Sequence, residues 1–169
     1  MNIQRVLRRH GIKSIWHFTD KSNLISIKKY GLLSLNHLLQ TNIYVPCFGA
    51  DDMSHYLDKQ IGIDKFVHLS FVKDHPMCHV ANRDGRIPNP VWLEIDLSVL
   101  HEDKTLFSDE VANKQGASIF DANDLESMID FDSILYERDF WKRKEARKAE
   151  IMVANNITLD DIKGVFYGY

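Results

Sequence analysis

The chain has 169 residues, of which 44% are hydrophobic, 27% charged and 11% aromatic. This composition is typical of one soluble globular domain and excludes a disordered chain. The formal net charge of −3 excludes nucleic-acid binding by a protein-wide positive field, so contacts with phosphates must come from a local patch. Two cysteines, Cys47 and Cys78, cannot make a disulfide framework. With no secretory signal and no membrane-spanning run, we expect one cytoplasmic domain over residues 1–169.

Short strands and short helices are expected to alternate along the chain. In chain order, they are a strand at 14–18, a helix at 23–30 that ends at Gly31, a helix at 51–59, a strand at 66–72, a helical turn at 75–81, a turn-rich segment at 82–90, a strand at 91–97, a charged helical or looped segment at 124–148, and short strands in 149–153, 157–162 and 164–169. This mixture predicts an α+β fold. No G-x-G-x-x-G motif supports a Rossmann-type NAD site.

His17 and Thr19 lie two residues apart at the end of the first expected strand. Because alternate residues of a strand share a face, these two side chains can hold a ribose or an amide together. The alternative is a half-buried strand end at which the backbone satisfies the histidine.

Glu150 precedes the apolar strand residues near the end of the chain. The period of a strand places it on one face with Met152, while residues 149, 151 and 153 form an apolar opposite face. A carboxylate there can accept a hydrogen bond from a sugar hydroxyl. It can also stabilise the positive charge that develops on the ribose of NAD as nicotinamide leaves. The alternative is an edge glutamate that faces water.

The densest basic stretch is 138–148, with six cations and two aromatic residues. If it is helical, Arg143 and Arg147 share a face, and Phe140 and Trp141 lie one turn back. Cationic groups bind phosphates and an indole stacks on an unpaired base. The candidate nucleic-acid contacts are Arg138, Trp141, Lys142, Arg143, Arg147 and Lys148. The alternative is a solvated helix whose Trp141 belongs to the core.

His75, Cys78 and His79 are the nearest approach to a metal motif. A helix would place residues 75 and 79 on one face, but a zinc site needs three or four ligands, and no further partner stands at an obvious distance. We therefore expect no metal, and we interpret His68 and Cys47 as structural.

Five groups of residues carry a resemblance to a known family. They are Ile15–Leu24, Gly31–Ser34, Val67–Phe71 with His75–Met77, Leu106–Asp109 with Ala112 and Asn113, and Lys148–Val153. In this order they resemble the DarT-like family of nucleic-acid ADP-ribosyltransferases, and the similarity spans nearly the whole chain.

The resemblance implies an ADP-ribosyltransferase core, in which two small facing β-sheets and short helices surround an NAD cleft. Glu150 would be the catalytic glutamate, and the charged segment before it would be the substrate-recognition loop. The implied NAD contacts are His17, Phe18, Thr19, Asn23, Ser34 and His55. Members of the family are typically toxins that modify a base in single-stranded DNA. An antitoxin, such as a macrodomain-type hydrolase, keeps them in check, so a toxin–antitoxin or phage-defence role is also implied.

One feature departs from the family pattern. The family carries an arginine between the Gly-Leu-Leu-Ser and Leu-Ser-Phe segments, whereas this chain has no arginine between Arg9 and Arg83. His55 and Lys59 are the candidates to replace it, which makes Lys59 a candidate catalytic residue. A lysine, however, lacks the bidentate fork of a guanidinium.

Lys148 bears on the choice of substrate. Superfamily members that modify arginine usually place a second Glu or Gln two residues before the catalytic glutamate, and here that place holds Lys148. A cation repels a guanidinium and attracts a phosphate, which favours a nucleic-acid target.

We therefore expect transfer of ADP-ribose from NAD to a base in single-stranded DNA. Transfer to RNA is the nearest alternative, because recognition of a 2′-hydroxyl takes only one well-placed group. A metal-independent ribonuclease would use His17, His75 or His79 as acid and base and would cleave without NAD. A non-catalytic nucleic-acid-binding module would be indifferent to Glu150→Ala.

Overall fold

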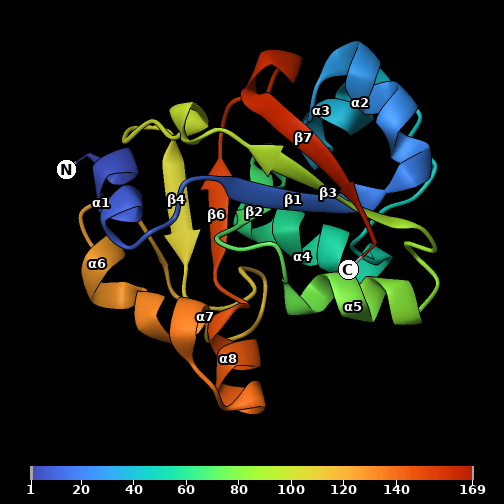
Figure 1. The fold of residues 1–169 in the computed structure, drawn as a ribbon. Coiled ribbons are helices and arrows are strands. Elements are labelled where there is room, and N and C mark those ends of the chain that lie inside the picture. Colours follow the sequence, from blue (N-terminus) through green and yellow to red (C-terminus); the bar gives the residue numbers. More distant parts are fainter. Residues whose placement is uncertain (1, 169) are drawn as a thin grey trace.

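Seven short strands form one antiparallel sheet in the order β5-β4-β6-β2-β1-β3-β7. The strands of this computed structural model, which describes residues 2–168, are β1 (Ile15–Asp20), β2 (Val67–Ser70), β3 (Pro90–Ile95), β4 (Thr105–Ser108), β5 (Ile119–Phe120), β6 (Glu150–Val153) and β7 (Ile162–Tyr167). Helices lie between and beside them (Figure 1). The expected α+β class is confirmed.

The sheet has two halves that meet between β1 and β2. β1 pairs with β3 over its whole length, but in the described part of the chain it is registered to β2 only through Trp16 and Ser70. Figure 1 shows β1, β3 and β7 running across the direction of β4 and β6. The two small sheets implied by the resemblance are thus present as halves of a single sheet, because the Trp16–Ser70 pair joins them.

Eight α-helices are described between residues 2 and 168. They are α1 (Ile3–Arg9), α2 (Leu24–Tyr30), α3 (Leu35–Thr41), α4 (Asp52–Ile61), α5 (Pro76–Arg83), α6 (Leu125–Met128), α7 (Phe131–Tyr136) and α8 (Phe140–Ala146). Polar residues cap several of them: the side chains of Asp51 and Asp139 accept hydrogen bonds from N–H groups in the first turns of α4 and α8. These caps satisfy backbone donors that have no partner within the helix.

Gly31 ends α2 and brings the chain back against the C-terminal segment. Its φ is +79°, and a Cβ at this position would lie 2.5 Å from the carbonyl oxygen of Ile157. Only glycine allows both this backbone conformation and this approach. Leu32 then pairs with Ile157 in an isolated bridge, which fixes the start of α3 beside the sheet.

The expected strand ends and helix ends agree with the structure to within a few residues for β1, α2, α4, β2, α5, β3 and β6. α1, α3, β4 and β5 are additional to the elements expected. The expected strand at 157–162 is instead a bridge residue followed by the 3-10 turn Leu159–Asp161, and β7 begins at Ile162. Residue 169 of the last expected strand lies outside the described residues.

Candidate active site

A cavity lies where β1 and β2 separate. Its walls come from β1, β2, the start of β6, α4 and the loop that precedes α4. They include His17, Phe18, Thr19, Asn23, His55 and Glu150, six of the residues expected at the site. Residues more than a hundred positions apart in the sequence therefore line one cavity.

The carboxylate of Glu150 points inward and is held by three elements. Oε2 accepts hydrogen bonds from Nδ1 of His68 at 3.1 Å and from the backbone N–H of Ala112 at 3.3 Å. Oε1 lies 3.9 Å from Nε2 of His75. The side chain is only 12% exposed. The alternative of an edge glutamate in open water is therefore wrong.

His68 supplies the charge that keeps Glu150 ionised. Burial alone lowers the pKa of His68, but the hydrogen bond and negative charge of Glu150 outweigh burial and raise that pKa to about 9. Both ring nitrogens then carry protons, and Nε2 donates to the carbonyl of Ile63 at 3.2 Å. For Glu150, burial alone raises the pKa, but the hydrogen bond and the charge of His68 outweigh burial, so that its pKa is lowered. The pair is a buried imidazolium–carboxylate.

His17 is held in one tautomer. Burial lowers its pKa to about 4, so the ring is neutral at physiological pH. Nδ1 lies 2.9 Å from the carbonyl oxygen of His68, which can only accept, so Nδ1 carries the proton and Nε2 is an acceptor. The cavity therefore presents a fixed hydrogen-bond acceptor from β1 as well as the carboxylate of Glu150 from β6.

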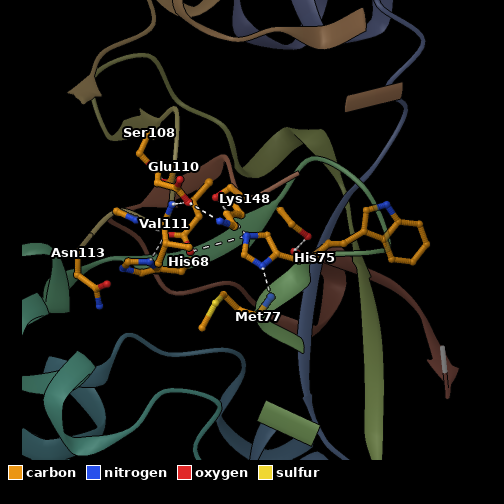
Figure 2. Close-up of polar contacts among 12 residues, drawn as sticks. His68, His75, Met77, Ser108, Glu110, Val111, Asn113 and Lys148 are labelled. Atoms are coloured by element: carbon orange, nitrogen blue, oxygen red, sulfur yellow. Dashed lines mark hydrogen bonds and ion pairs between the residues drawn. The ribbon is translucent and has the colours of Figure 1, made fainter. Parts of the chain in front are cut away.

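His75 fixes the backbone just before Glu150. Its Nδ1 accepts from the N–H of Met77 at 3.2 Å, so Nε2 carries the proton and donates to the carbonyl of Lys148 at 3.3 Å. Burial lowers the pKa of this histidine, which keeps it neutral. Figure 2 shows the ring of His75 between Lys148 and Met77, with His68 farther away. His75 thus positions the start of β6 and has no ring nitrogen left for acid–base work.

Asn23 clamps two parts of the cavity wall together. Its Nδ2 donates to Oγ1 of Thr19 at 2.9 Å and to the carbonyl of Cys47 at 2.6 Å, and its Oδ1 accepts from the N–H of Cys47 at 3.1 Å. The side chain is 5% exposed. All its polar groups are used within the protein, so Asn23 shapes the cavity and orients Thr19.

The family of this chain is set by its sequence match. A family model described as DarT, ssDNA thymidine ADP-ribosyltransferase, matches residues 16–168. The chain belongs to the DarT family. NAD-dependent ADP-ribosyl transfer, with NAD as co-substrate, is therefore confirmed as its activity. None of the curated proteins is a significant match.

Solved DarT structures share the fold. A Thermus sp. 2.9 DarT in complex with ADP-ribosylated ssDNA matches with a TM-score of 0.71 and 17% identity, over 92% of this chain and 81% of that one. The same enzyme in complex with NAD+ matches with a TM-score of 0.64 and 17% identity, over 91% and 81%. A Thermosipho africanus DarTG in complex with ADP-ribose matches with a TM-score of 0.73 and 18% identity, over 93% of this chain and 44% of that one.

Two residues implied by the DarT resemblance lie outside the cavity walls. Ser34 is the N-cap of α3, and its hydroxyl accepts from the N–H of His37 at 3.3 Å. Lys59 is exposed on α4, because the cavity side of that helix carries Ser54, His55 and Asp58. In the structure Ser34 is therefore a helix cap and Lys59 a surface residue. The NAD contact of Ser34 and the catalytic role of Lys59 stay predictions.

One of the two candidates to replace the missing family arginine, His55, lies at the cavity. His55 lines the cavity, and its ring packs edge-on against Phe48 at a centroid distance of 5.0 Å. Arg86, from the turn before β3, donates to the carbonyl of Gly49 in the cavity-lining loop. Arg86 therefore stabilises the loop, although in the sequence it lies outside the interval in which the DarT pattern has its arginine.

The basic segment forms α8 and exposes its aromatic residues. Trp141 is 67% exposed and Phe140 is 57% exposed, with ring centroids 5.2 Å apart, and Nζ of Lys144 lies 5.3 Å from the indole. The alternative that Trp141 belongs to the core is therefore wrong. Arg138 and Lys142 are also exposed.

Three cations of the same segment bind the protein itself. Arg143 donates to the carbonyl of Glu137 at 2.9 Å. Arg147 pairs with Asp74 at 2.5 Å. Lys148 pairs with the carboxylate of Glu145 at 2.7 Å. These bonds fix the segment that leads into Glu150, whereas Arg138 and Lys142 stay exposed.

The sequence interpretation missed His68 and its role. Its segment belongs to the DarT resemblance, but the sequence alone leads us to interpret the histidine as structural. The available signal is register, because β2 pairs antiparallel with β6, so that His68 is opposite Met152 and one strand period from the pair Ser70–Glu150. His68 can be placed beside the carboxylate of Glu150 only when β2 and β6 are known to be neighbours.

Residues 2–168 contain neither a metal-binding cluster nor a membrane-spanning helix. No group of three or more His, Cys, Asp or Glu side chains is arranged to hold a metal ion. No helix in this part of the chain has the length and apolar character needed to span a membrane.

Proposed function

We propose that the chain transfers ADP-ribose from NAD to a thymidine base of single-stranded DNA. The observation that carries the proposal is the cavity that joins His17 on β1 to the ionised Glu150 on β6. The description of the DarT family and the solved Thermus complexes with ssDNA and NAD+ support the choice of substrates.

The cavity residues fit the nicotinamide end of NAD. Nε2 of His17 offers an acceptor to a hydroxyl or to a carboxamide N–H, and Thr19 offers a hydroxyl whose orientation Asn23 fixes. Phe18 adds an aromatic wall. A neutral acceptor suits these uncharged donors.

Glu150 supplies the electrostatic part of the mechanism. NAD provides the ADP-ribosyl group, and positive charge develops on its ribose as nicotinamide leaves. In this role Glu150 hydrogen-bonds a ribose hydroxyl and stabilises that charge with a carboxylate which His68 and Ala112 already orient. Preorganisation of this kind lowers the cost of reaching the transition state, because the site does not rearrange as charge appears.

Helix α8 is proposed to hold the DNA strand. Trp141 offers a flat exposed ring to a base, while Arg138, Lys142 and Lys144 offer positive charge to phosphates. Stacking on an indole requires an unpaired base, which favours a single strand over a duplex.

The biological role is proposed to be that of a toxin within one ADP-ribosyltransferase domain, 1–169, in the cytoplasm. The structural match to a DarTG supports an antitoxin partner, such as a macrodomain-type hydrolase. Growth arrest on expression of the wild type, and normal growth with Glu150→Gln, is the expected result; equal toxicity of the two would contradict the role.

Intact-mass analysis tests the enzymatic proposal. Purified protein is incubated with NAD and sequence-matched single-stranded DNA, duplex DNA and RNA. We expect an added ADP-ribose on thymidine-containing single-stranded DNA, its loss with Glu150→Gln, and no change with the matched control Glu126→Gln on α6. Modification of the RNA alone would show that the substrate is RNA and not DNA. Cleavage in the absence of NAD would instead indicate a nuclease.

A further inference from the structure

A second carboxylate, Asp58 on α4, lines the same cavity as Glu150. We propose that Asp58 is the residue that accepts the proton from the target base during transfer. This inference rests on the proposed function and deepens it, because it assigns the proton-transfer step that attack by a base nitrogen requires.

Asp58 is held by a side chain from the loop between β4 and β5. Nδ2 of Asn113 donates to its Oδ1 at 2.7 Å and also reaches the carbonyl of Ser54 at 3.5 Å. Figure 2 shows Asn113 beyond His68, on the side away from His75. This arrangement orients the carboxylate and leaves Oδ2 without a hydrogen-bond partner among the described residues. One oxygen is thus fixed and the other is available to a ligand.

The charged groups around Asp58 come from three elements. His55 lies on its own helix, His68 lies on β2 and Glu150 lies on β6, and all three act on its charge. Burial raises the pKa of Asp58 and the charge of Glu150 raises it further, whereas His68, Asn113 and His55 act in the opposite direction without cancelling the rise. The pKa of Glu150 is lowered in the same cavity.

Two carboxylates with pKa values displaced in opposite directions are suited to different tasks. Glu150 is bound to His68 and stays ionised, which suits it to a ribose on which positive charge develops. Asp58 is a stronger base than an exposed aspartate, and it has a free oxygen for a proton. Efficient general bases have pKa values moved toward the working pH.

The chemistry of the step balances with these residues alone. A thymine base in DNA has one ring N–H, at N3. As N3 forms its bond to C1′ of the ribose, the C1′–nicotinamide bond breaks and its electron pair leaves with neutral nicotinamide. The N3–H bond breaks, and its proton passes to Oδ2 of Asp58 and then to solvent. No oxidant or further reactant is needed.

The variant Asp58→Asn separates this role from NAD binding. The amide keeps an oxygen for Asn113 but cannot accept the proton. We expect transfer to thymidine to fall by about 10²-fold or more, while hydrolysis of NAD to free ADP-ribose, in which water replaces the base, stays within several-fold of wild type. Asp52→Asn, an exposed aspartate on the same helix, is the matched control and should behave as wild type. Equal losses of transfer and hydrolysis would assign Asp58 to cofactor binding and overturn the proposal.

A more acidic base should rescue the variant. In 5-bromo-2′-deoxyuridine, bromine replaces the methyl group at similar size and acidifies N3–H. Asp58→Asn should therefore recover a larger fraction of wild-type transfer on an oligonucleotide with this base than on thymidine. Absence of any selective recovery would contradict proton acceptance by Asp58.

The wild type provides a test that does not depend on the folding of a variant. As the pH falls and Asp58 takes up a proton, transfer to thymidine should decline before NAD hydrolysis does, and the brominated substrate should decline less. Parallel pH profiles would overturn the proposal. If wild-type protein modifies no thymidine at any pH, the proposed function itself fails, and that result is distinct from a failure confined to Asp58.

Discussion

Nδ1 of His68 donates a hydrogen bond to Oε2 of Glu150 at 3.1 Å, and the carbonyl of the same histidine accepts from Nδ1 of His17 at 2.9 Å. One residue on β2 therefore connects the proposed NAD-binding histidine to the proposed catalytic carboxylate. Its side chain sets the charge of Glu150 and its backbone sets the tautomer of His17. A substitution at His68 should therefore act on Glu150, while the backbone carbonyl that binds His17 remains.

The stability of the protein should depend on pH through this pair. The pKa of Glu150 is lowered in the folded state, so its contribution is present above the ordinary carboxyl range and is lost as pH falls through the folded pKa. The pKa of His68 is raised to about 9, so its contribution is complete below its ordinary value of 6.5 and is lost as pH rises through about 9. The pair therefore contributes most in mildly acidic solution.

His68→Gln removes the cation and should flatten this dependence. We expect a loss of about 1–3 kcal/mol in the free energy of unfolding near pH 6, and a smaller loss near pH 10, from denaturant titrations at each pH. His101→Gln is the matched control, since His101 is exposed. A loss equal at both pH values would show that the ring contributes by packing and not by its charge.

Glu150→Gln should separate binding from chemistry. The amide keeps the shape of the carboxylate, so NAD affinity should stay within several-fold of wild type, while release of nicotinamide should fall by about 10²-fold or more. The same variant should lower the pKa of His68 from about 9, because burial then acts without the opposing carboxylate. An NMR titration of the His68 ring measures that shift. An unchanged ring pKa would place the two residues apart in solution.

Local pattern was enough to predict some elements. β1 and β6 are short apolar runs whose polar residues, His17, Thr19 and Glu150, mark the wall of the site, and α2 is bounded by a polar start and by Gly31. These features depend on neighbouring residues, which the sequence displays directly. The α+β class follows from their alternation.

Local sequence pattern does not predict contacts between strands that are far apart in the sequence. β4 and β5 are edge-region strands of four and two residues, and pairing with β6 and with each other holds them in place. The roles of His68 and Asp58 likewise depend on residues that are distant in the sequence. His68 contacts Glu150 on β6, and Asp58 contacts Asn113. The catalytic role of Lys59 stays a prediction, because residue type alone does not indicate which side of α4 faces the cavity, and Lys59 lies on the exposed side.

Trp141 should be a binding residue that the fold does not require. Its indole is 67% exposed, so Trp141→Ala should leave the free energy of unfolding nearly unchanged. If the indole stacks on a base, affinity for single-stranded DNA should weaken by about 1–3 kcal/mol, which fluorescence anisotropy can measure. Tyr30→Ala, an exposed aromatic on α2, is the control and should bind as wild type. If the Trp141 variant binds DNA with the same affinity as the wild type, Trp141 on α8 does not contact the DNA.

Asn23 should act through the cavity wall, because its amide bonds to Thr19 and to both backbone groups of Cys47. Asn23→Ala leaves those buried groups without partners, and we expect a loss of about 1–3 kcal/mol in stability together with weaker NAD binding. Asn23→Asp keeps an acceptor for the Cys47 N–H but places an anion against the Cys47 carbonyl, so it should be no better than alanine. Thermal unfolding with and without NAD separates the two effects. If either variant binds NAD as wild type does, the loop at Cys47 does not form part of the binding surface, and Asn23 serves the fold alone.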